Sequence, residues 1–99
     1  MKHELKCVNP AFQAKWDGIK SWEYRKKDRN YKVGDILIEK EYYPETNTYS
    51  GRSIEEEVVW MIEGGVFGIP EGYVIMSTKI IRNVYHPKDE SQEWKSKTD

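Results

Sequence analysis

The segment from Ser21 to Lys27 constrains the fold more than any other, because its residues alternate in character with a period of two. Trp22 and Tyr24 share one parity. Glu23 and Arg25 share the other. This alternation predicts a β-strand with two chemically different faces. We expect the aromatic pair to face the core and the charged pair to lie on the opposite face.

The composition also favours a sheet over a helical bundle. The 99-residue chain contains four Trp, seven Tyr and two Phe, whereas leucine occurs only at positions 5 and 37. Aromatic and β-branched side chains suit the pleated surface of a sheet. Hydrophobic residues make up 37% of the chain and charged residues 33%, which indicates one small domain with a thin core.

Further runs of alternating or β-branched residues predict strands at 3–8, 35–43, 53–62 and from residue 73 onwards. Turn-forming residues at 44–47 indicate a hairpin between the second and third of these runs. Its arms carry three tyrosines that we expect to stack on one another: Tyr42, Tyr43 and Tyr49. In the third run, the even positions from 54 to 62 are apolar, except for Glu56.

One short helix is expected after Asn9-Pro10. Asparagine can cap a helix, and proline is tolerated at the first helical position because it has no backbone donor. Phe12, Trp16 and Ile19 follow at spacings of four and three, so we expect them on one helical face. Gly18 can end the helix in the left-handed conformation.

These elements predict an α+β fold, a small mixed β-barrel of five to six strands with one or two short helices. Closure of the sheet would protect its edges. We expect a single domain over residues 1–86, followed by a polar, flexible tail at 87–99.

The charge is distributed unevenly along the chain. The net charge of −1 argues against a protein that holds nucleic acid by bulk electrostatics. Nevertheless, residues 15–32 contain seven cations against three carboxylates, a net +4, and residues 39–63 contain seven carboxylates against two cations, a net −5. Such halves could steer a charged ligand toward one face, although runs of charge are most often plain solvated surface.

The cysteine and histidine content bears on compartment and cofactors. A single cysteine, Cys7, excludes an internal disulfide and suits a reducing cytoplasm. The chain start lacks the apolar run of a signal peptide, and no segment is long enough to span a bilayer, so no membrane partner is expected. His3 and Cys7 share a strand parity, but no third ligand stands at a zinc-like spacing. We therefore predict no metal and no cofactor, with Cys7 as a small buried hydrophobe.

A series of short motifs occurs in order along residues 3–77: His3-Glu4-Leu5-Lys6, Gly18-x-Lys20-x-x-Glu23-x-Arg25, Gly34-Asp35-x-Leu37, Tyr49-x-Gly51-Arg52 and Gly72-Tyr73-Val74-x-Met76-Ser77. In these motifs the chain resembles the ASCH/PUA-like superfamily, and within it a small bacterial and phage family of unknown function. The resemblance implies a PUA-like pseudo-barrel with a cleft beside the first helix and a role connected with nucleic acid.

The resemblance and the charges together define a candidate site. We expect Lys20, Glu23, Arg25 and Arg29 to form it, and the first motif adds Lys6. A carboxylate accepts hydrogen bonds from an exocyclic amine or a ribose hydroxyl, and a guanidinium offers a planar fork for phosphate. RNA or a modified nucleoside is the expected partner. The competing interpretation is a set of surface ion pairs, each worth about 0–1 kcal/mol.

Two other functions stay open at this point. The superfamily includes a small amidohydrolase that deacylates acetylated cytidine, and its catalytic lysine is matched by Lys20, but its catalytic threonine falls at Glu23. The other alternative is a phage accessory protein that contacts another protein through an acidic surface at residues 55–57. The oligomeric state, monomer or weak dimer, is left open.

Overall fold

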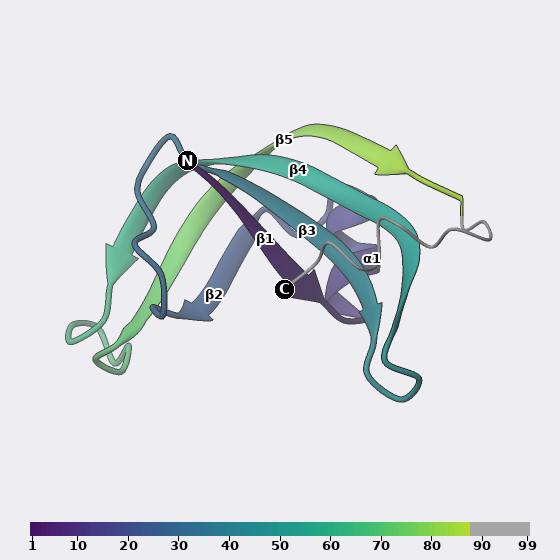
Figure 1. Ribbon diagram of the computed structural model, residues 1–99. Helices are drawn as coiled ribbons and strands as arrows, with labels where there is room; N and C mark the ends of the chain where they lie inside the picture. Colours follow the sequence, from purple (N-terminus) through teal and green to yellow (C-terminus); the bar gives the residue numbers. More distant parts are fainter. Residues whose placement is uncertain (88–99) are drawn as a thin grey trace.

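Five strands and one helix make up the computed structural model, which describes residues 1–87 (Figure 1). The elements, in chain order, are β1 (Lys2–Cys7), α1 (Ala11–Trp16), β2 (Trp22–Lys26), β3 (Ile36–Tyr43), β4 (Thr48–Glu63) and β5 (Tyr73–Tyr85). All five expected strands and the early helix are therefore present. Most of the expected tail, residues 88–99, lies outside the described residues.

The strands form one sheet in the order β1-β3-β4-β5-β2. β1 pairs with β3 in parallel, and the other pairs are antiparallel. The sheet curls strongly, so that its two edge strands, β1 and β2, approach each other on the side where α1 lies (Figure 1). The architecture is thus a curled half-barrel with one short helix, compatible with the small barrel-like α+β fold expected from the sequence.

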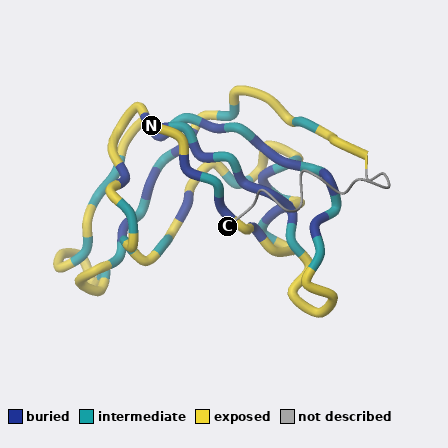
Figure 2. Tube along the Cα trace, in the orientation of Figure 1, coloured by how far each residue is buried: buried dark blue, intermediate teal, exposed yellow. Residues whose placement is uncertain are grey.

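Buried hydrophobic side chains form two clusters. One is built around Leu5, Tyr31, Leu37, Val58, Val74 and Met76. The other joins α1 to the sheet through Cys7, Phe12 and Ile54. Figure 2 shows this distribution, with burial concentrated in the middle of the strands and exposure at the turns.

The hairpin between β3 and β4 is confirmed. Tyr42 pairs with Tyr49 across it, and their ring centroids lie 5.0 Å apart. Asn47 adopts a positive φ of 58° in the turn, a conformation that asparagine tolerates better than most residues.

The expected direction of β2 is wrong, although its alternation is right. Glu23 is 5% exposed, whereas Trp22 and Tyr24 are 49% and 45% exposed. The charged pair therefore faces the interior and the aromatic pair faces outward. The physical reason is that the interior beside β2 holds the charged Lys15 of α1, which pairs with Glu23.

The expected helix face is also partly wrong. Gly18 has a φ of +78° and turns the chain directly after the helix, as expected. Because α1 has already ended at Trp16, Ile19 leaves the helical face and is 77% exposed. Lys15 takes the inward position and is fully buried with Phe12.

The even positions of β4 do not stay on one face. Ile54, Glu56 and Val58 are fully buried, but Trp60 is 56% exposed. The pairing register with β5 shifts between Val58 and Trp60, and such a bulge redirects the side chains that follow it. Glu56, which interrupts the apolar pattern in the sequence, is an interior residue.

Candidate functional site

A cleft lies between the two edge strands, beside α1. Its volume is about 390 Å³. Its walls are Lys6 and Cys7 of β1, Val8 directly after β1, Ala11 of α1, and residues 23–26 of β2. The cleft exists because β1 and β2 are both edges and do not pair with each other. The opening therefore follows from the strand order, and β2 brings Glu23 and Arg25 to it.

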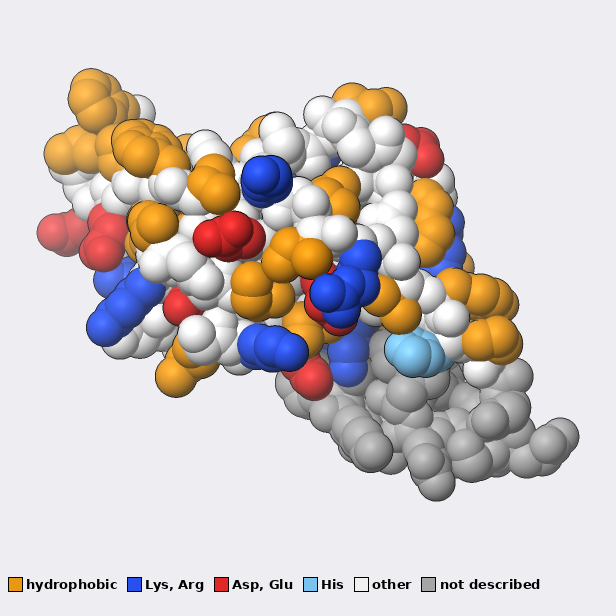
Figure 3. Space-filling model, turned by 90° about the horizontal axis from the view of Figure 1, so that it is seen from above, with side chains coloured by type: hydrophobic (Ala, Val, Ile, Leu, Met, Phe, Trp, Pro, Cys, Tyr) orange, Lys and Arg blue, Asp and Glu red, His pale blue; other side chains and the backbone are white. Residues whose placement is uncertain are grey.

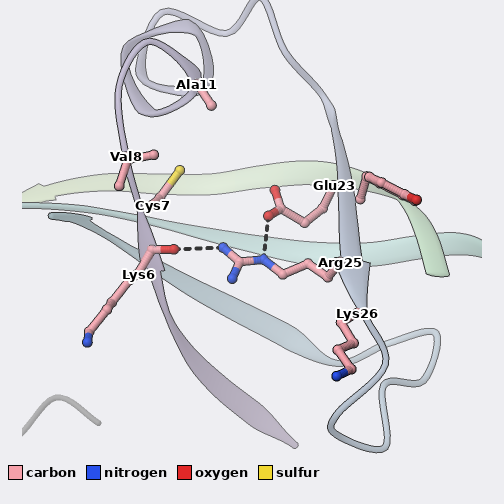
Figure 4. Close-up of a pocket in the computed structure, with 8 residues that line it drawn as sticks. Lys6, Cys7, Val8, Ala11, Glu23, Arg25 and Lys26 are labelled. Atoms are coloured by element: carbon pink, nitrogen blue, oxygen red, sulfur yellow. Dashed lines mark hydrogen bonds and ion pairs between the residues drawn. The ribbon is translucent and has the colours of Figure 1, made fainter. Parts of the chain in front are cut away.

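Arg25 bridges the two edges of the cleft. Its Nε donates to Glu23 Oε2 at 2.6 Å, and its Nη2 donates to the Lys6 carbonyl oxygen of β1 at 2.8 Å (Figure 4). Nη2 also lies 3.3 Å from Glu39 Oε1. A guanidinium carries five N–H groups in a rigid fork, so one side chain can hold several acceptors at once.

Lys15 stands behind this pair, fully enclosed. Its Nζ lies 2.9 Å from Glu56 Oε2, 3.2 Å from Glu23 Oε1 and 3.6 Å from Glu39 Oε2. Burial by itself would lower the pKa of Lys15, but the surrounding carboxylates outweigh it and raise the pKa above its ordinary value. Lys15 is therefore a fixed ammonium and not a proton acceptor.

The carboxyls of this cluster differ in how strongly they hold a proton. Three cations, Lys15, Lys20 and Arg25, lie at ion-pair distance from its three carboxyls, Glu23, Glu39 and Glu56. Complete burial, aided by the neighbouring carboxylates, raises the pKa of Glu39 well above its ordinary value. Burial would also raise the pKa of Glu23, but hydrogen bonding with Glu39 and the nearby cations lower it instead. Glu39 thus keeps its proton to a higher pH than Glu23 does.

Carboxylate oxygens of Glu23, Glu39 and Glu56 lie within 4.8 Å of one another, as metal ligands would. The Lys15 ammonium lies among these oxygens and supplies the positive charge that they surround. His3, which the sequence places at the same strand parity as Cys7, lies away from this cluster. Its Nε2 lies 2.8 Å from Asp35 Oδ2.

Cys7 lines the cleft and is 5% exposed. Burial, followed by the charge of Glu39 and Glu23, raises the pKa of its thiol well above the ordinary value. A thiol of this kind stays protonated and is a poor nucleophile. Cys7 therefore packs as a small hydrophobe, as expected.

The structure brings three of the five predicted site residues together, namely Lys20, Glu23 and Arg25. The side chains of Lys6 and Arg29 do not join them. Glu23 and Arg25 point into the space between β2 and β1, and Lys20 Nζ lies 3.6 Å from Glu23 Oε1 while donating to the Trp22 carbonyl. Lys6 offers its backbone carbonyl to the cleft, but its side chain extends away (Figure 4). Arg29 does not line the cleft, and its Nε lies 3.9 Å from Asp28 Oδ1.

Sequence reasoning missed the three interior charges Lys15, Glu39 and Glu56. A signal was present for Glu56, which stands in an otherwise apolar set of positions. Lys15 follows Phe12 by three residues and so shares its helical face. Of the acidic surface expected at residues 55–57, Glu56 is not part, because it is fully buried against Lys15, whereas Glu55 and Glu57 are half-buried.

The fold and the cleft define a small, curled β-sheet domain with an ion network at its open side. The chain belongs to the family described as a domain of unknown function (DUF3850), whose model matches residues 2–78. This match agrees with the resemblance to a small bacterial and phage family of unknown function that the sequence motifs indicate.

A phage protein also matches. The protein of Escherichia phage P2 described as an uncharacterized 12.9 kDa protein in the GpA 3′ region is 39% identical over 56 residues. The match covers 57% of this chain and 50% of the phage protein, so the chain spans about half the length of this relative. Within residues 1–87, no helix has the length and apolar character needed to cross a membrane.

Proposed function

We propose that this domain binds RNA or a nucleotide-like ligand in the cleft between β1 and β2. The observation that supports it most is the Glu23–Arg25 pair, which presents a carboxylate and a guanidinium side by side. A carboxylate accepts hydrogen bonds from base amines or ribose hydroxyls, and a guanidinium matches phosphate oxygens. The resemblance to the ASCH/PUA-like superfamily points in the same direction.

Arg25 keeps capacity for a ligand. Its contacts within the described part of the chain use Nε and Nη2, which leaves the N–H groups of Nη1 for an incoming acceptor. Glu23 Oε1 is buried and lies at ion-pair distance from Lys15 and Lys20. A ligand that brings an anionic acceptor would complete Arg25.

Titration with short single-stranded RNA and with free nucleotides, at low and high salt, tests this proposal. We expect salt-sensitive binding, because phosphate contacts release counterions. Arg25→Met should weaken it by about tenfold or more, the range of a charge-assisted hydrogen bond. Arg82→Met is the matched control, since Arg82 is exposed and pairs only at the surface with Glu55. Equal affinity of folded Arg25→Met and the wild type would contradict the proposal.

The amidohydrolase alternative has weaker support. Water attack on an amide needs a group that accepts a proton. Lys15 is held as an ammonium by three carboxylates, and the Cys7 thiol stays protonated. Lys20 and Glu23 remain the candidates for this chemistry. Incubation with acetylated cytidine and analysis of the products decides it: deacetylation by the wild type that is lost in Lys20→Ala would favour the enzyme.

A further inference from the structure

The outer face of β2, β5 and β4 carries exposed aromatic side chains in neighbouring rows. Trp22 and Trp60 flank Ser77 from its two sides. Directly paired residues of an antiparallel sheet lie on the same face, so both indoles belong to this surface. Tyr24 lies in the next row, where Ile75 pairs with Ile62. We call Trp22, Tyr24 and Trp60 the aromatic face.

These side chains are outside for reasons that involve their neighbours. The inward side of β2 is occupied by Glu23 and Arg25, which leaves the outward side for the aromatic rings. On β4, the bulge after Val58 turns Trp60 outward. Each of the three rings is between 45% and 56% exposed, an unusual amount of aromatic surface on one sheet face.

Two lysines flank the rings on β2. Lys20 Nζ stands 4.0 Å from the centroid of the Trp22 ring. Lys26 follows Tyr24 at the same strand parity, is exposed, and has no ion-pair partner among residues 1–87. Along β2 the two rings, Trp22 and Tyr24, are thus flanked by Lys20 on one side and Lys26 on the other. The face seen in Figure 3 is likewise mixed, with hydrophobic side chains between separate cations and carboxylates.

We propose that the aromatic face stacks the bases of a single-stranded nucleic acid whose neighbouring nucleotide occupies the cleft. This inference rests on the proposed function and specifies its ligand as an oligomer. Successive same-face residues of a strand are roughly 6.6 Å apart, which separates the Trp22 and Tyr24 rings enough for two bases. Tyr24 stacks on Tyr73 with ring centroids 5.4 Å apart, so a base would stack on its other side. Aromatic rings stack on any base, and the lysines that flank the two rings meet the phosphates.

Strand β2 connects the two parts of this surface. Its inward side chains, Glu23 and Arg25, line the cleft, and its outward side chains, Trp22 and Tyr24, belong to the aromatic face. Tyr24 also borders the cleft, so the two parts meet at this residue. A single strand that crosses the free edge of β2 would contact both. A second copy of the chain fits this face less well, because lysine is depleted from protein–protein interfaces and Lys20 stands directly over Trp22.

Ligand length provides the test. Binding of fluorescently labelled RNA of six nucleotides is measured by anisotropy, with unlabelled hexamer and mononucleotide as competitors. We expect the hexamer to bind at least tenfold more tightly than the mononucleotide. The variant Trp22→Ala, at a residue outside the cleft wall, should lose about tenfold or more in hexamer affinity and keep its mononucleotide affinity. Tyr85→Ala is the control, since Tyr85 is 59% exposed at the far end of β5.

Trp60→Ala provides an independent variant on a different strand, in case Trp22→Ala does not fold, and should also weaken hexamer binding selectively. Equal affinity for both ligands, or hexamer binding unchanged in the folded variants, would overturn the inference and leave the cleft proposal standing. Wild-type protein that binds neither ligand would defeat the proposed function itself. Self-association that these variants abolish would assign the face to a second copy and overturn the inference.

Discussion

At the scale of single residues, Lys15 explains why charged side chains are found inside this small domain. An ammonium loses several kcal/mol of hydration when it is buried, and partial compensation requires anionic partners at close range. Glu23, Glu39 and Glu56 supply these partners from three different strands. Each of the four residues is therefore buried because of the others.

Lys15→Met should destabilise the protein by about 3–5 kcal/mol at pH 7, because Glu23 and Glu56 lose their central cation. Without that cation the folded-state pKa of Glu23 rises, because fewer cations oppose the effect of its burial. A buried carboxyl whose folded-state pKa rises loses stability as the pH rises toward that pKa, and it loses none below the unfolded pKa. The loss should therefore be smaller at pH 5 than at pH 7, as measured by urea unfolding.

Lys27→Met is the matched control, since Lys27 forms an ion pair with Glu63, which is 58% exposed, and its removal should cost less than about 1 kcal/mol. Introducing Glu56→Leu into Lys15→Met should recover part of the stability. A Lys15→Met protein as stable as the wild type at pH 7 would show that the buried cluster is not held by this cation.

Glu41 predicts a separate dependence on acid. Burial by itself would raise the pKa of Glu41, but hydrogen bonds with Arg52, Ser50 and Asn9 lower it to about 2. Because the folded-state pKa lies below the unfolded value of about 4.5, the stability from Glu41 is present above pH 4.5 and is lost as the pH falls toward 2.

Glu41→Gln should flatten the loss of stability between pH 4.5 and 2 relative to the wild type. Urea midpoints measured across this window provide the comparison. Glu45→Gln, in the exposed hairpin turn, is the control and should leave the slope unchanged. An identical acid slope in Glu41→Gln would mean that the contact with Arg52 does not set the acid limit.

At the scale of elements, local sequence determined which segments form strands and the helix, but not all of their ends and not always which face is buried. β4 begins at Thr48, five residues before the expected start at 53. The helix is the clearest case. Gly18 turns the chain after the helix, as expected. Because the helix itself ends at Trp16, the turn carries Ile19 away from the sheet. The helix therefore docks through Phe12, Trp16 and the charged Lys15.

Phe12→Ala should cost about 3–5 kcal/mol, because it removes a fully buried ring from the cluster that joins α1 to the sheet. Ile19→Ala should change stability by no more than about 0.5 kcal/mol, since Ile19 is 77% exposed. Urea unfolding of both variants checks the assignment. A larger loss for Ile19→Ala than for Phe12→Ala would contradict the observed face of the helix.

At the scale of the whole molecule, the half-barrel is held together across its open side by a side chain. Arg25 connects β2 to the Lys6 carbonyl of β1, where a closed barrel would have backbone hydrogen bonds. The same gap forms the cleft. Arg25 therefore both joins the two edge strands and lines the cleft.

Arg25→Met should destabilise the domain by about 2–4 kcal/mol, because it removes a cation from Glu23 and Glu39 and breaks the contact between the edges. Amide hydrogen exchange should rise more in β1 and β2 than in the β3–β4 hairpin. Arg82→Met should leave both measurements nearly unchanged. A uniform rise in exchange across the sheet would contradict a specific role at the gap.

The sequence by itself determined the strands, the hairpin, the end of the helix and the alternation that places Glu23 and Arg25 on one face of β2. Those two residues were also predicted for the site, and they do line the cleft. Only the tertiary structure decided that this face points inward and that Lys15, Glu39 and Glu56 meet there. Alternation is a local property of the backbone, whereas burial of charge depends on partners that the curled sheet gathers from distant elements.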